Sequence, residues 1–160
     1  MKRMFPLVIA MIGAMVVALA PASPASAHPG FHVIVLEGSM SITDEDWPDS
    51  DDYGFKRFSG VINLPPTATS GSARFEGCAD EVRVVLEVVA THSLSLFADG
   101  RVVVTTRTKL YEGASCATTD LELSVARSMT VPAYATKSDN WTVNASGNSS
   151  GLVLTVRNAV

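Results

Sequence analysis

The sequence predicts an all-β protein: an antiparallel β-sandwich of about eight or nine strands with one disulfide, preceded by a cleaved signal peptide. Three observations lead to this fold class. The N-terminal segment has the pattern of an export signal, and the rest of the chain repeats its apolar residues with a period of two. The two cysteines are far apart in a chain that we expect to fold in an oxidising compartment.

Residues 1–27 have the three parts of a secretory signal peptide. Lys2 and Arg3 carry positive charge, an apolar run of about 13 residues follows, and Ala25-Ser26-Ala27 fits the small-x-small cleavage site. The apolar run is shorter than the roughly 20 residues that span a bilayer, so cleavage is favoured over a retained transmembrane helix. The alanine-rich leader is typical of a bacterial exported protein. We therefore expect a secreted chain that starts at His28 and has no membrane span after processing.

Residues 28–160 are long enough for a single domain with its own core and too short for two ordinary domains. Without Lys2 and Arg3, 10 basic residues stand against 16 acidic ones, which gives a formal charge of −6. A chain with this balance lacks the basic surface that binding to nucleic acid or to anionic membranes requires. We therefore expect one β-sandwich domain that does not bind nucleic acid.

Two segments show the period-two alternation most clearly. Residues 82–90 and 102–110 place apolar or β-branched residues at every second position, which is typical of strands with one buried face. The alternation predicts a core that includes Val84, Leu86, Val88, Val102, Val104, Leu123 and Leu154. β-branched residues also dominate the other candidate strands, which are residues 31–43, 53–63, 72–76, 121–127, 130–135, 141–146 and 151–158.

Turn-forming residues separate these segments. The interruptions are Pro65-Pro66, the Ser/Thr/Gly stretch at residues 67–72, Asp99-Gly100 and residues 148–151. No stretch of residues 28–160 has the 3.6-residue period of an amphipathic helix. Short strands at this spacing favour a β-sandwich over a barrel.

Cys78 and Cys116 are the two cysteines of the chain, and we expect them to pair outside the cytoplasm. Closing a loop of roughly 40 residues stabilises a fold by about 4 kcal/mol through loop-closure entropy. The wide spacing argues against redox chemistry, which favours a Cys-x-x-Cys pair. The bond also constrains the topology, because the two Cα atoms must lie within about 7 Å.

Strand direction decides whether these cysteines can meet. If residues 81–97 form one long strand with a bulge near His92, both cysteines lie at one end of the sandwich, whereas a full turn at 91–93 places them at opposite ends. The disulfide therefore favours the long strand. The loops that share the cysteine end are then 44–52, 77–80 and 112–118, with the acidic residues Asp80, Glu81, Glu112 and Asp139. His28, His32 and the 99–100 turn are expected at the other end.

Residues 44–52 are the densest functional signal in the chain. They contain six of its 16 acidic residues, and carboxylates at this spacing can supply several of the six to eight oxygen ligands of Ca²⁺. The loop is not an EF-hand, because the position that requires glycine is Asp49. One hypothesis is a Ca²⁺ site, with the layout of sandwich domains that bind Ca²⁺ between apical loops, made by Asp44, Asp46, Asp49, Asp51 and Asp52. The other is a solvated acidic loop that keeps the neighbouring edge from aggregating.

His28 offers an alternative metal site. A histidine at the first position can bind one metal ion through both its α-amine and its ring, and neutral imidazole suits Cu(II). With a second imidazole the arrangement resembles the copper histidine brace of lytic polysaccharide monooxygenases and of certain small periplasmic copper carriers, which are built on β-sandwiches. The resemblance implies that His92, or less easily His32, supplies that second imidazole. The competing hypothesis is a frayed N-terminus with an ordinary surface histidine.

Trp47 and Trp141 are expected to flank the acidic end, with Tyr53 and Tyr134 nearby. Exposed aromatic rings can stack on sugars or anchor a protein partner, whereas buried rings cap the core. The Ser, His and Asp residues lack a Gly-x-Ser-x-Gly elbow. The leading hypothesis is a secreted, non-enzymatic binding or structural module with a protein or carbohydrate partner and Ca²⁺ as cofactor. The alternative is a copper-binding protein or a copper oxidative enzyme that uses His28.

Overall fold

The computed structural model describes residues 30–45, 51–93 and 100–159. These ranges contain eight strands and no helix, which confirms the all-β prediction. The strands are β1 (His32–Asp44), β2 (Asp52–Leu64), β3 (Ser70–Ala79), β4 (Val82–His92), β5 (Val102–Tyr111), β6 (Leu121–Val131), β7 (Thr136–Ala145) and β8 (Asn148–Ala159). In the described ranges, no helix has the length and apolar character that a membrane span requires.

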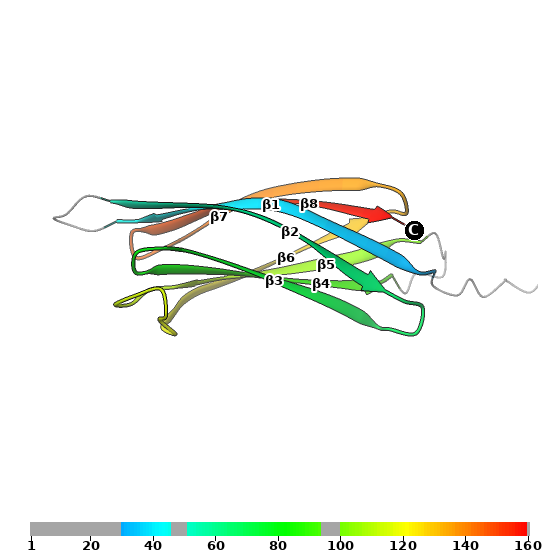
Figure 1. Ribbon diagram of the computed structural model, residues 1–160, viewed down its shortest axis with the longest axis horizontal. Helices are drawn as coiled ribbons and strands as arrows, with labels where there is room; N and C mark the ends of the chain where they lie inside the picture. Colours follow the sequence, from blue (N-terminus) through cyan, green and yellow to red (C-terminus); the bar gives the residue numbers. More distant parts are fainter. Residues whose placement is uncertain (1–29, 46–50, 94–99, 160) are drawn as a thin grey trace, which may run out of the picture.

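The strands form two antiparallel sheets of four strands that lie face to face (Figure 1). Sheet A has the order β2-β1-β8-β7 and sheet B the order β3-β4-β5-β6. All neighbours within a sheet are consecutive strands except β1 and β8, which pair at the centre of sheet A. Sheet A is therefore complete only when the last strand of the chain has reached the first.

The inward side chains of both sheets make one continuous core. Of the predicted core residues, Leu123 is partly buried on the edge strand β6, and the fully buried ones are Val84, Leu86, Val88, Val102, Val104 and Leu154. Sheet A faces them with Ile34, Leu36, Met40 and Ile42, which alternate along β1 as a strand with one buried face requires. The alternation read from the sequence therefore predicts the buried face correctly.

The two sheets meet differently at their two long edges. At the edge formed by β2 and β3 they approach so closely that a Cβ on Gly71 would collide with Ile62 of β2, and one on Gly77 with Met40 of the neighbouring β1. A side chain at either position would therefore have to displace its neighbour in the core. At the other edge, an ion pair between Arg127 of β6 and Asp139 of β7 joins the sheets.

The prediction of separate strands over residues 121–127 and 130–135 is wrong. β6 is continuous from Leu121 to Val131, and Ser128 pairs with Thr105 within it. The apolar pattern is interrupted there because β6 is an edge strand with an exposed outer face, which polar residues occupy.

The turn before β8 also differs from the expected position at residues 148–151. Ala145 pairs with Asn148, so the turn consists of Ser146 and Gly147 alone. Their φ angles are 51° and 93°, and positive φ at both central residues is the mark of a tight type I′ hairpin turn. Asn148 is therefore the first residue of β8.

The predicted meeting of the cysteines at one end is confirmed. Cys78 and Cys116 form a disulfide with their Cα atoms 5.8 Å apart. The bond lies at the end of the sandwich where β3 turns into β4 and β5 leads to β6, which we call the disulfide end. β4 ends at His92, and residues 94–97 of the predicted long strand lie outside the described residues. We call the end of the sandwich opposite the disulfide end the histidine end, because His32 and His92 both lie there.

Candidate functional site

Asp44, the first of the predicted Ca²⁺ ligands, is part of the fold. Its side chain is buried, and its Oδ2 accepts a hydrogen bond of 3.1 Å from the backbone N–H of Glu81. The contact links the end of β1 in sheet A to the β3–β4 turn of sheet B. A buried carboxylate needs such a partner, so Asp44 has a structural role at the disulfide end.

The structure describes two of the other four predicted ligands. Asp46 and Asp49 lie outside the described residues. Asp52 is exposed and lies directly opposite Asp44 in the β1–β2 register, and Asp51 accepts a hydrogen bond of 3.1 Å from the hydroxyl of Tyr53. Within the part of the chain that the structure describes, no group of three or more His, Cys, Asp or Glu side chains could hold a metal ion. What the structure brings together is the pair Asp44 and Asp52 at the base of the loop.

Tyr53 and Phe55 form an exposed aromatic pair on β2. Residues two apart in a strand share one face, and both rings project outward from sheet A. Their exposed fractions are 73% and 67%. The hydrogen bond to Asp51, followed by the negative charge of that carboxylate, raises the pKa of Tyr53 above its ordinary value. Tyr53 therefore stays neutral over the physiological pH range.

The cross-strand neighbours of this pair are small and uncharged. Thr43, Ser149 and Asn144 continue the row that begins with Tyr53, on β1, β8 and β7 respectively. Ser41, Gly151 and Thr142 continue the row of Phe55 in the same way. We call these eight residues the hydroxyl face. Its hydroxyl and amide groups can both donate and accept hydrogen bonds.

An open hollow of about 520 Å³ adjoins the hydroxyl face at the disulfide end. Asn144 and Ser149 belong to both, and the lining is completed by Glu45, Ala145 and the Ser146-Gly147 turn. The backbone N–H of Glu45 donates to Oδ1 of Asn148 at 3.0 Å, which holds this segment against β8. The hollow therefore adds a carboxylate to the uncharged groups of the hydroxyl face.

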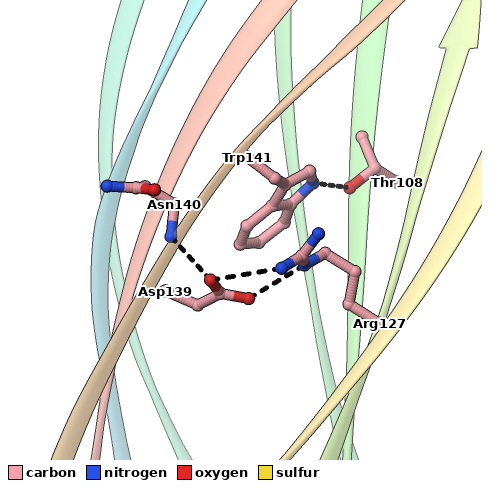
Figure 2. Close-up of polar contacts among 5 residues, drawn as sticks. All are labelled: Thr108, Arg127, Asp139, Asn140 and Trp141. Atoms are coloured by element: carbon pink, nitrogen blue, oxygen red, sulfur yellow. Dashed lines mark hydrogen bonds and ion pairs between the residues drawn. The ribbon is translucent and has the colours of Figure 1, made fainter.

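Trp141 belongs to the core, whereas Trp47 lies outside the described residues. The indole Nε1 of Trp141 donates to Oγ1 of Thr108 at 3.1 Å, and the guanidinium of Arg127 lies 5.7 Å from the ring centre (Figure 2). Asp139 accepts a bond of 2.9 Å from Nε of Arg127 and thus lies at the β6–β7 edge, away from the disulfide end where we expected it. Trp141 therefore closes the core and is not available to a ligand.

His32 and His92 lie side by side at the histidine end. Their ring centres are 5.2 Å apart, with an angle of 61° between the planes. Nδ1 of the buried His32 lies 2.8 Å from Oδ1 of Asn158, and Nε2 of His92 lies 3.2 Å from the carbonyl oxygen of Pro65. His28, the predicted copper ligand, lies outside the described residues. The structure therefore places both candidates for the second imidazole together.

Asn158 is a buried residue that sequence reasoning missed. Its Nδ2 donates to the carbonyl oxygens of Gly100, Val131 and Pro132 at 2.9 to 3.2 Å, so it joins β8 to the ends of β5 and β6. The alternation in the sequence could have revealed it, because Asn158 lies four residues after Leu154 and therefore on the same inward face of β8. A polar residue at an inward position of a strand predicts a buried hydrogen-bond network.

No protein-family model and no curated protein matches this chain. Its function is therefore inferred from the fold and from these sites.

Proposed function

We propose that this protein is a secreted, non-enzymatic binding module that recognises a carbohydrate through the hydroxyl face of sheet A. One observation carries the proposal. Tyr53 and Phe55 expose their rings on the same side of β2, and the six residues beside them are small and uncharged. Secretion follows from the expected signal peptide, and the binding surface follows from this arrangement.

The two rings are suited to stacking. An exposed, contiguous aromatic pair adds little to folding stability, and such patches mark interaction sites. An aromatic ring presents a large apolar face, and the phenol of Tyr53 adds a polar group at its edge. Neighbours of this kind along a strand are about 6.7 Å apart. One extended ligand can therefore contact both rings.

The chemistry of the hydroxyl face favours an uncharged ligand. Burying a charged group against it would remove water from that group without supplying an opposite charge. The hydroxyls of Thr43 and Thr142 can each donate and accept hydrogen bonds, as the hydroxyls of a sugar do, and the hydroxyl of Ser41, which donates to the carbonyl oxygen of Gly151, can still accept. A protein partner would favour a broader core of large apolar side chains and Arg, whereas this face places two rings beside six small residues. We therefore favour a carbohydrate over a protein.

Binding to insoluble polysaccharides tests this proposal. The mature protein is mixed with cellulose, chitin or isolated cell-wall sacculi, and the unbound fraction is measured after sedimentation. We expect binding to at least one of them, and we expect the double variant Tyr53→Ala/Phe55→Ala to bind about tenfold or more weakly, because central aromatic residues dominate such contacts. The fold should persist, since both rings are exposed.

Tyr134→Asn is the matched control for that experiment. Tyr134 is 79% exposed but lies in the β6–β7 turn at the histidine end. Its φ of 56° is one that asparagine tolerates, so the substitution removes an exposed ring without straining the turn. Retained binding is expected. A wild-type protein that binds none of the three polysaccharides, or a double variant that binds as well as wild type, would contradict the proposal.

Calcium binding by residues 44–52 is a second candidate. Its support is the direct opposition of Asp44 and Asp52, because like charges at opposed positions of a strand pair repel and a bound cation would relieve that repulsion. Asp46, Asp49 and Asp51 are the further proposed ligands. Ca²⁺ would then stabilise the disulfide end beside the hydroxyl face.

Thermal unfolding tests the calcium site. Millimolar Ca²⁺ should raise the melting temperature relative to EDTA, because a ligand that binds only the folded state stabilises it. Asp52→Asn should reduce this rise, and Mg²⁺ at the same concentration is the control for ionic strength. An unchanged melting temperature in millimolar Ca²⁺ would leave residues 44–52 as a solvated acidic loop.

A further inference from the structure

The hydrogen bonds at the histidine end determine which ring nitrogens carry protons. Nδ2 of Asn158 faces three carbonyl oxygens and is therefore the amide NH₂ group, so Oδ1 faces His32 and accepts a hydrogen bond from its Nδ1–H. The carbonyl of Pro65 can only accept, so Nε2 of His92 is the donor in that contact.

The remaining nitrogen of each ring can only accept a hydrogen bond. A neutral imidazole carries one proton, which leaves a lone pair on Nε2 of His32 and on Nδ1 of His92. Nδ1 of His92 is buried and has no hydrogen-bond partner in the structure. Buried polar atoms are almost always satisfied, so this nitrogen requires a partner, either water or a metal ion.

We propose that His32 and His92 bind one transition-metal ion, Cu²⁺ or Zn²⁺, through these two nitrogens. Two imidazoles on one tetrahedral Zn²⁺ ion, with metal–nitrogen distances of about 2.0–2.1 Å, have ring centres roughly 5 Å apart, and the square-planar geometry that Cu²⁺ favours brings them somewhat closer. The observed separation is 5.2 Å. Neutral imidazole is a preferred ligand of both metals.

The surroundings of the pair support this assignment. A metal-binding histidine usually donates its other N–H to a carbonyl or carboxylate, which holds the ring and its tautomer in place. Here the side-chain carbonyl of Asn158 and the backbone carbonyl of Pro65 have that role. Asn158 is itself held by three carbonyl groups, so the position of His32 is fixed before a metal arrives.

The site is distinct from the proposed carbohydrate surface and from the N-terminal copper site expected from the sequence. It lies at the opposite end from the hydroxyl face, and its two protein ligands do not include His28. Two imidazoles leave further coordination positions for water or another ligand.

Metal titration of the untagged, EDTA-treated mature protein tests the site. Isothermal titration with Cu²⁺ and with Zn²⁺ should show one equivalent of binding, and electron paramagnetic resonance of the Cu²⁺ form should show nitrogen ligands. His92→Gln should weaken binding roughly 100-fold, because one of two protein ligands is lost. The glutamine amide can still donate to the Pro65 carbonyl, so the fold is retained, and thermal unfolding of the variant checks this.

His32→Gln and His28→Ala complete the experiment. The first should weaken binding as strongly as His92→Gln does, whereas the second should leave one equivalent bound to the pair. Absence of stoichiometric binding in the wild-type protein would overturn the proposal. So would binding that survives His92→Gln, or binding that is lost only in His28→Ala, because the metal would then be held by the N-terminus or by scattered side chains.

Discussion

The outer faces of the two sheets carry different kinds of side chain, although the sheets have the same number of strands. On sheet A the hydroxyl face has short uncharged side chains beside two exposed rings. On sheet B long charged side chains contact each other across strands. Nζ of Lys109 lies 2.7 Å from Oε1 of Glu87, and the guanidinium of Arg83 lies 4.5 Å from the ring centre of Tyr111. Sheet B therefore covers part of its own outer face, whereas the hydroxyl face of sheet A stays open to solvent.

Two valines show the consequence of this difference. Val85 and Val153 both point outward from central strands, yet Val85 is 1% exposed and Val153 is 46% exposed. The cross-strand partners of Val85 are Glu76 and Lys109, whereas those of Val153 are Ser39 and Asn140. Long side chains lay their apolar stems over a neighbour, and short ones cannot. The exposure of an outward residue therefore depends on its neighbours across the strands.

The largest expected effect is the difference in free energy of unfolding between alanine substitutions at these two valines. Val85→Ala should lower the free energy of unfolding by about 1–2.5 kcal/mol, because it removes buried apolar area. Val153→Ala should change it by less than about 0.5 kcal/mol, as is usual for an exposed site. Urea unfolding of both variants measures the difference. Equal losses would show that the two outer faces are covered to the same extent.

A smaller effect concerns the ion pair on sheet B. The hydrogen bond from Lys109 holds the pKa of Glu87 below its ordinary value. A lowered carboxylate pKa stabilises the fold above the unfolded value of about 4.3, and that contribution is lost as the pH falls through the lower folded value. Lys109→Met should therefore cost about 0.2–1 kcal/mol at neutral pH and progressively less as the pH falls below about 4.

Arg57→Met on the outer face of sheet A is the control for this ion pair. None of the ion pairs among the described residues involves the exposed Arg57, so the substitution should leave the free energy of unfolding unchanged at every pH. Chemical unfolding at several pH values makes the comparison. A Lys109→Met cost that is the same at low and neutral pH would mean that the ion pair with Glu87 is not its source.

The smallest expected effect is confined to the ionisation of one side chain on sheet A. Asp51→Asn should return the pKa of Tyr53 to about 10, because the charged hydrogen-bond acceptor is removed. Ultraviolet absorbance follows the phenolate, and Tyr53→Phe identifies its share of the signal among the three tyrosines. We expect no measurable change in stability, because the ring is exposed. An unshifted titration curve in Asp51→Asn would show that the contact is absent in solution.

The sequence by itself determined the fold class, the buried face of the central strands and the pairing of the cysteines. The first two features depend on the local pattern of each strand, and the third depends on the number of cysteines. Alternation along β4 and β5 shows which side chains are buried, and two cysteines allow one pairing once the chain folds outside the cytoplasm. The outlines of most strands follow from the same pattern.

Only the tertiary structure decided which residues meet across strands. The pairing of β1 with β8, the burial of Trp141 and the exposure of Tyr53 and Phe55 depend on partners distant in the sequence. The same holds for the contact between His32 and His92 at the histidine end. Alternation tells which of two faces a side chain is on, but it carries no information about register or about the neighbours on that face. Both candidate sites therefore became visible only in the folded chain.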